Sequence, residues 1–146
     1  MKKTLFSSLF LFSIFFTDAQ LRKIPASVTD AFTARYPHAT KIEWKDKLQY
    51  FEASFVLNGV NIKADFSSKG EWEGSEREVG YNQLPEEVKD GFQKSKYADR
   101  QKNAAYEVQE LGKPLQYRIS VQKSSLEKKN IYFDVNGKLI KEVIVL

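Results

Sequence analysis

The 146-residue sequence has no cysteine, a single histidine and no run of five or six basic residues. Without cysteine the chain forms no disulfide, offers no thiol nucleophile and carries no lipid-modified N-terminal cysteine. A zinc site of the common His and Cys kind has too few ligands here. Lysine and arginine are interspersed with acidic residues, which argues against a nucleic-acid surface. We therefore expect no disulfides, no metal or other cofactor, and no nucleic-acid partner.

Few residues offer a starting point for catalysis. His38 follows Pro37 and is interpreted as a turn residue, with a Ser–His triad around it as the alternative. Residues Asp134 to Gly137 match part of a calcium loop but lack its later glutamate, so a turn explains them. An acidic run is interpreted as a solvated strand face, with weak cation binding as the alternative: Glu71, Glu73, Glu76 and Glu78. We predict no catalytic and no metal-binding residue.

The N-terminus has the features of a secretory signal peptide. Two lysines precede an apolar run from Leu5 to Phe16, and small side chains stand before a cut after Ala19. The run is too short to cross a bilayer, which needs about 20 residues. We predict a signal peptide over residues 1–19 and a mature protein without a membrane anchor, located in the periplasm or secreted.

Two segments have helical periodicity. In "IPASVTDAFTARYP", Val28, Ala31 and Phe32 lie on one helical face behind a first-turn proline. The segment "LPEEVKDGFQKSKY" repeats the pattern 60 residues later, with Val88 and Phe92 matching Val28 and Phe32. Both segments therefore predict a short amphipathic helix.

The clearest strand signal surrounds Asn58-Gly59, the two-residue loop of a type I′ hairpin. This loop places four apolar pairs on one face: Leu57 with Val60, Phe55 with Ile62, Ala53 with Ala64, and Phe51 with Phe66. Turn chemistry and alternation agree on this register, so one face of the hairpin is predicted to be buried and the other solvated.

Further strands are expected near residues 41–45, 72–79, 104–111 and 115–122 and around Ile131–Phe133. "SSLEKKN" is expected to be a longer polar loop. The last strand, residues 139–146, is apolar on both faces, so we expect it to be covered or central and to be the seam between two sheets.

The pattern "FxxxG" occurs at Phe66 and again at Phe133, and it follows the repeated helix. We interpret this as an internal duplication. The predicted fold is α+β, with two tandem repeats of one helix and a four-stranded antiparallel sheet over residues 24–80 and 84–146. The repeats are expected to form a single domain over residues 20–146, joined into one curved sheet with both helices on one face.

The stretches "IPASVTDAFTARYPHATKIEW" and "YFEASFVLNGVNIKADFSSKGEW", followed by the second round from Leu84, resemble the PepSY-like family of exported proteins. The family name also records a likeness to the β-lactamase inhibitor protein, which clamps an enzyme with the concave face of an eight-stranded sheet. The resemblance implies binding through an open sheet face. That inhibitor has disulfides, which this chain lacks, and none of its contact residues is carried over.

Several polar and aromatic residues alternate out of phase with the predicted core and form a candidate binding face: Tyr50, Glu52, Ser54, Lys63, Arg118, Ser120, Gln122 and Tyr132. Tyr and Arg are enriched where proteins bind proteins; an ordinary exposed sheet face is the alternative. We interpret the chain as an exported non-catalytic module that binds a protein or peptide of the cell envelope, including as a β-lactamase or peptidase inhibitor. The alternatives are a structural or small-ligand-binding envelope protein and, less favoured, a hydrolase.

Overall fold

The computed structural model describes residues 22–145, and the predicted signal peptide lies outside them. The described chain forms one antiparallel sheet of eight strands in the order β1 to β8. Its elements are α1 (Ala26–Arg35), β1 (Thr40–Asp46), β2 (Tyr50–Leu57), β3 (Val60–Ser67), β4 (Trp72–Val79), the 3₁₀ turn η1 (Tyr81–Gln83), α2 (Glu86–Gln93), β5 (Gln101–Glu110), β6 (Gln116–Ser124), β7 (Glu127–Asp134) and β8 (Leu139–Val145).

The prediction of two tandem repeats, each with its own four-stranded sheet, is wrong. The strands form a single eight-stranded sheet, because β4 pairs with β5 over six residues from Gly74–Glu110 to Val79–Ala105. The α-helices contribute little to the chain, ten residues in α1 and eight in α2. Alternation within each strand predicts the strands, but it does not show which strands pair across the middle of the chain.

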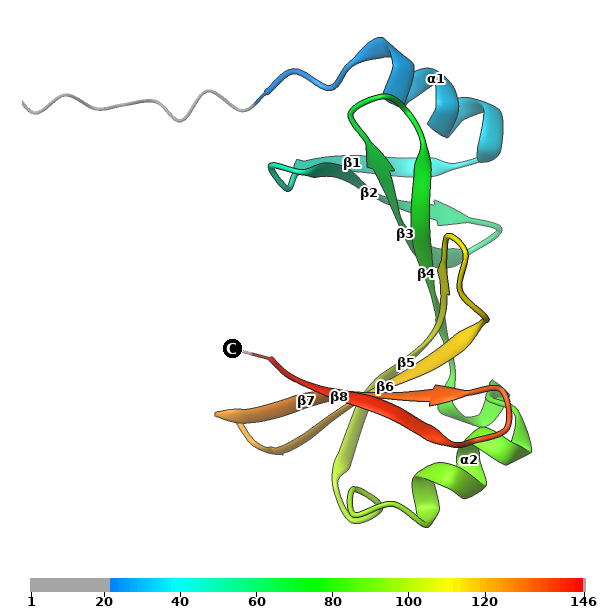
Figure 1. Cartoon of the computed structure of the whole chain (residues 1–146), viewed down its shortest axis with the longest axis vertical. Coiled ribbons are helices and arrows are strands. Elements are labelled where there is room, and N and C mark those ends of the chain that lie inside the picture. Colours follow the sequence, from blue (N-terminus) through cyan, green and yellow to red (C-terminus); the bar gives the residue numbers. More distant parts are fainter. Residues whose placement is uncertain (1–21, 146) are drawn as a thin grey trace, which may run out of the picture.

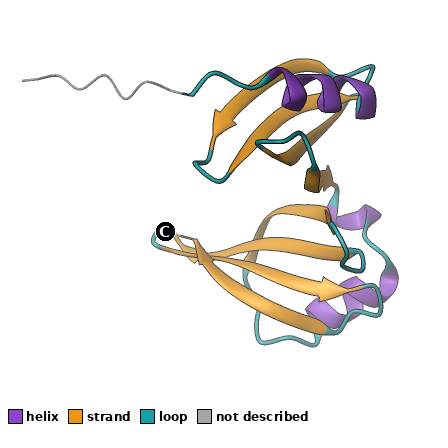
Figure 2. Cartoon of the chain, turned by 45° about the horizontal axis from the view of Figure 1, so that its top comes forward, coloured by secondary structure: helices purple, strands orange, loops and turns teal. Residues whose placement is uncertain are grey.

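The sheet curves so strongly that the molecule has the shape of a C (Figure 1). Both helices lie on the outer, convex side, α1 against the first strands and α2 against the last ones, as Figure 2 also shows. The inner, concave face carries no helix. Among the described residues, no helix is long and apolar enough to cross a membrane.

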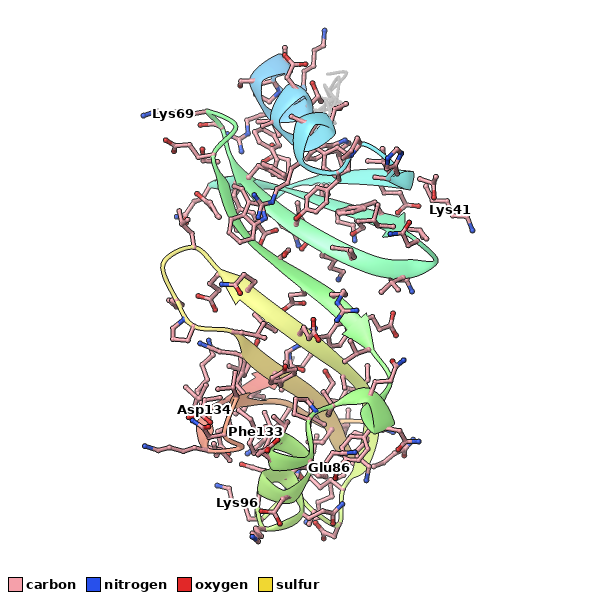
Figure 3. All side chains as sticks on the ribbon, turned by 90° about the vertical axis from the view of Figure 1, so that its right-hand side faces the viewer. Lys41, Lys69, Glu86, Lys96, Phe133 and Asp134 are labelled. Carbon is pink, nitrogen blue, oxygen red and sulfur yellow. The ribbon has the colours of Figure 1, made fainter. Side chains whose placement is uncertain are left out.

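Each helix covers its own hydrophobic core on the convex side. Under α1, Phe32 packs edge-on against Phe55 with ring centroids 5.0 Å apart. Under α2, Phe92 meets Phe133 at 6.3 Å, beneath the helix that begins at Glu86 (Figure 3). Burial of each phenylalanine contributes about 2–3 kcal/mol. The core residues of β2 and β3 are those of the predicted hairpin, and all four predicted apolar pairs are confirmed.

Glycines let the helices approach the turns closely. A Cβ on Gly70 would lie 2.3 Å from the carbonyl oxygen of Ser27, and one on Gly137 would lie 1.9 Å from that of Glu87. Both glycines also have positive φ, +86° and +77°. The two "FxxxG" turns therefore need glycine for backbone conformation and for contact with a helix.

Two further expectations about strands are wrong. The last strand, β8, is not covered, central or a seam: it pairs only with β7, at the edge of the sheet, and all seven of its residues are exposed. "SSLEKKN" is not a long loop, because Ser124 pairs directly with Glu127 around a two-residue turn. Lys128 and Lys129 continue into β7, where alternation is hidden because both faces carry lysine.

Candidate functional site

The candidate site is the concave face of the sheet, opposite both hydrophobic cores. The strand register places Lys63 beside Glu76, Glu76 beside Val108, and Val108 beside Gln116. Directly paired residues of an antiparallel sheet point to the same face. Side chains of β2 to β7 therefore share one continuous surface, although the strands come from both halves of the chain.

A groove of about 400 Å³ lies on this surface and is lined by residues from both halves of the sheet. Five of the eight predicted face residues line it: Tyr50, Glu52, Lys63, Arg118 and Tyr132. Its other walls include Asp65, Glu73, Glu76, Val108 and Glu110. The groove therefore combines aromatic rings, two basic groups and several carboxylates around one buried valine.

Arg118 is held in place at the centre of the sheet. Its Nη2 atom lies 2.8 Å from Oε2 of Glu76, and its guanidinium lies 4.1 Å from the ring centroid of Tyr106. The side chain is only 15% exposed, and its Nε has no hydrogen-bond partner within residues 22–145. An arginine fixed by an ion pair and a ring loses little side-chain entropy when it binds a partner.

Carboxylates crowd the other side of the groove. Burial, followed by the nearby charges of Glu52, Glu76 and Glu73, raises the pKa of Asp65 from 3.8 to about 6. Lys47 acts in the opposite direction but more weakly. Like charges held together in this way reduce the stability of the folded protein, so a partner that brings positive charge would relieve repulsion here.

The two predicted tyrosines line the groove from opposite halves of the sheet. Tyr50 lies on β2, and burial together with the charge of Asp65 raises the pKa of its hydroxyl. Tyr132 lies on β7, with the ammonium of Lys141 4.4 Å from its ring centroid. Both residues are partly exposed, and both line the groove.

The other three predicted residues share the face but do not line this groove. Ser54 borders a neighbouring hollow near Tyr106. The hydroxyl of Ser120 donates to Oδ1 of Asn130 at 2.7 Å, and Gln122 is hydrogen-bonded to Gln101 and Asn103. The polar groups of Ser120 and Gln122 are therefore engaged within the protein.

Sequence reasoning missed the part of the site that comes from β5. Tyr106, Val108 and Glu110 face the concave side because they pair with Glu78, Glu76 and Gly74. Their spacing of two residues was the available signal. This signal was hidden because the opposite face of β5 carries both an apolar residue, Ala105, and a charged one, Glu107. Apolar and polar residues therefore do not alternate regularly along the strand.

Of the residues weighed for chemistry, only Glu73 and Glu76 line the groove. His38 is exposed in the turn after α1. The carboxylate of Asp134 accepts hydrogen bonds from the backbone of Asn136 and Lys138, as in an Asx turn. In the acidic run, Glu73 and Glu76 line the groove, whereas Glu71 bonds Ser67 and Glu78 bonds Asn61. Across residues 22–145, no group of three or more potential ligands is placed to hold a metal ion.

Comparison with known proteins gives a consistent picture. Residues 49–141 match the model of a family described as "Putative beta-lactamase-inhibitor-like, PepSY-like". A "BLIP-like protein" from Bacteroides fragilis NCTC 9343 is 25% identical, with a TM-score of 0.77 over 88% of this chain and 91% of that one. None of the curated proteins matches the sequence.

Two further solved structures are similar. One, from Bacteroides eggerthii DSM 20697 and described among "putative periplasmic proteins", is 25% identical, with a TM-score of 0.79 over 85% of this chain and 91% of that one. The other, a DUF2874 family protein from Bacteroides uniformis ATCC 8492, is 24% identical, with a TM-score of 0.77 over 83% and 89%, and it supports the fold alone. The predicted location is confirmed: the protein is periplasmic or secreted.

Proposed function

Since the chain belongs to the PepSY-like, beta-lactamase-inhibitor-like family, we propose that it is an exported non-catalytic module that binds a protein or peptide of the cell envelope through its concave face. The observation that carries the proposal is the groove between the two halves of the sheet, with Arg118 and two tyrosines around it. The convex face is occupied by both helices, whereas no described helix covers the concave face.

The composition of the groove favours a protein partner. Tyr and Arg are enriched among the residues that dominate the energetics of protein interfaces, and Tyr buries a large area at low entropic cost. Arg118 is already fixed by Glu76 and Tyr106, so the face is preorganised for binding. A protruding loop that carries a basic side chain would fit the carboxylates around Asp65.

An inhibitory role is the finer form of the proposal. The B. fragilis neighbour is described as BLIP-like, and a curved sheet that receives a loop at an enzyme's active site blocks substrate access. The candidate targets are β-lactamase-type enzymes and peptidases of the envelope. Purified protein that slows none of a panel of such enzymes would remove the inhibitory role and leave the binding role to be tested by capture.

The binding role is tested by capture from envelope extract, with variants matched across the sheet. Arg118→Ala removes the arginine paired with Glu76 on the concave face, and Arg77→Ala removes one paired with Glu107 on the convex face. We expect Arg118→Ala, combined with Tyr50→Ala, to abolish saturable capture of one partner, and Arg77→Ala to preserve it. Equal capture by both variants would contradict the concave face as the binding surface.

A second candidate function is binding of a small ligand. The groove of about 400 Å³ falls within the usual range of ligand pockets, roughly 300–1,000 Å³. It is, however, open and lined mainly by charged groups, whereas such pockets are mostly apolar. Native mass spectrometry of the purified protein distinguishes the two: a bound small molecule that Arg118→Ala removes would favour the ligand.

A further inference from the structure

A second hollow adjoins the groove on the concave face. It has a volume of about 370 Å³ and is lined by residues of β1 to β5. We call it the Tyr106 hollow; its walls also include Ser54, Val56, Asn61 and Glu78. Most of its exposed surface is apolar, whereas the groove is lined mainly by charged groups.

The hollow offers a fixed apolar surface. The amide of Asn61 donates to Oε2 of Glu78 at 2.8 Å, and the ring of Tyr106 is held against the guanidinium of Arg118. Val56 is partly exposed and pairs with Asn61 in the sheet, so both side chains point to the concave face. Because these polar groups are already paired, the occupant that gains most from the hollow is an apolar side chain.

The hollow and the groove form one continuous surface. Lys63 and Glu76 line both of them. Along β5, Tyr106 borders the hollow and Val108 borders the groove, two residues and therefore about 7 Å apart. Side chains on one face of an extended segment have the same spacing. A segment that lies along the strands thus reaches both places with neighbouring side chains of one face.

The charge of the surface specifies the second side chain. Five carboxyl side chains line the groove and two more line only the hollow, against three basic side chains in all. The whole chain, in contrast, has a formal net charge of +4. Glu76 is paired with Arg118, whereas Asp65 and Glu73 form no ion pair within residues 22–145. A basic side chain complements this part of the groove.

We propose that the concave face binds an extended segment of its protein partner with an apolar side chain seated in the Tyr106 hollow and a basic side chain, two residues away, seated in the groove. The inference rests on the proposed function, since it names the chemistry of the partner at the same face. Residues two apart in an extended segment project to the same side, whereas adjacent residues project to opposite sides. Spacing, as well as composition, therefore decides which segments bind.

Blocked peptides of identical composition test the spacing. Each carries one phenylalanine and one lysine among serines and threonines, two residues apart in the first peptide and adjacent in the second. NMR chemical shifts of the exported chain follow the binding. We expect the first peptide to shift the amides of Val56 and Tyr106 saturably and to bind at least about tenfold more tightly than the second, because only the first seats both side chains. Equal binding, or no saturable shift at these amides, overturns the proposal.

Substitutions in the protein test the hollow. Val56→Gln should weaken binding of the first peptide by about tenfold, and Val135→Gln, at an exposed valine (45%) of the β7–β8 turn, should leave it unchanged. Val56→Thr keeps the shape of the side chain and should weaken binding in the same direction, which separates a lost apolar contact from a disturbed fold. Full binding by both Val56 variants overturns the proposal. Benzyl alcohol that shifts the same amides as strongly as the peptide, at equal concentration, assigns the hollow to a small molecule and also overturns it.

Failure of this proposal is distinguishable from failure of the proposed function. Capture from envelope extract that Arg118→Ala with Tyr50→Ala abolishes, but Val56→Gln preserves, would overturn the role of the hollow and leave the concave face as the binding surface. Capture preserved in all of these variants would contradict the concave face itself.

Discussion

Replacing Gly91 by alanine separates helix propensity from packing. Gly91 lies within α2, where alanine ordinarily stabilises a helix by about 1 kcal/mol relative to glycine. Here a Cβ would lie 1.9 Å from the carbonyl oxygen of Gly137 and 2.8 Å from its carbon. Both are backbone atoms of the β7–β8 turn, so no flexible side chain can move aside.

Relief of this contact requires α2 to move outward by roughly 1.5 Å, because ordinary van der Waals contact begins near 3.4 Å. That movement loosens Val88 and Phe92, both fully buried, from Phe133. Overpacking of this kind costs about 1–3 kcal/mol, and the lost core contacts add to it. After the gain in propensity is subtracted, we expect Gly91→Ala to lower the free energy of unfolding by about 2 kcal/mol.

Urea denaturation followed by circular dichroism measures this change, and the melting temperature should fall by about 5–10 °C. Gln93→Ala, at an exposed position of the same helix, should remain within about 0.5 kcal/mol of the wild type. A Gly91→Ala protein as stable as the wild type, or more stable, would refute the argument that α2 is seated by backbone contact.

Three other predictions concern stability. Because the native Asp65 carboxyl, with a pKa of about 6, holds its proton more tightly than the unfolded one at 3.8, its contribution to stability falls as pH rises between these values. Asp65→Asn should therefore be more stable than the wild type at pH 8, by about 1 kcal/mol after solvent screening, and equal to it below about pH 4 in urea titrations. Tyr97 is 1% exposed and its hydroxyl has no partner within residues 22–145, so Tyr97→Phe should raise the unfolding free energy by about 1 kcal/mol; a clear loss would point to an unrecognised partner. Residues 20–80 and 81–146, expressed separately, should show no sharp thermal transition, because each fragment exposes the strand that forms the β4–β5 pairing; a sharp transition in either one would mean independent domains.

The β2–β3 hairpin was predictable because two independent signals coincide. Asn58 and Gly59 have the positive φ that a type I′ turn needs, and apolar residues alternate on both sides of them. The β6–β7 hairpin lacked turn-specific residues and had alternation on one side of its turn: buried residues alternate along β6 at Tyr117, Ile119 and Val121, but not at the start of β7. Its turn residues, Ser125 and Leu126, are not turn-specific, and lysines occupy both faces of the strand that follows. Strands are thus predictable from sequence where turn chemistry and burial agree.

The apolar composition of β8 misled the sequence reasoning for a physical reason. Residues that are apolar on both faces are typical of a strand covered on both sides. In the described structure, however, β8 is an edge strand whose residues are all exposed. Its apolar composition therefore does not match its exposed position.

The β4–β5 pairing, which joins the two halves of the sheet, was missed because these strands have no continuous apolar face. Neither helix covers the middle of β4 and β5, so water reaches both sides and both sides carry charge. Arg77 pairs with Glu107 on the convex face, and Glu76 pairs with Arg118 on the concave face. A strand that is polar on both faces has no alternation, which is why the sequence pattern suggested a boundary at this point. The same polarity supplies the carboxylates and the fixed arginine of the groove, so the region that sequence reasoning placed least well is also the candidate binding site.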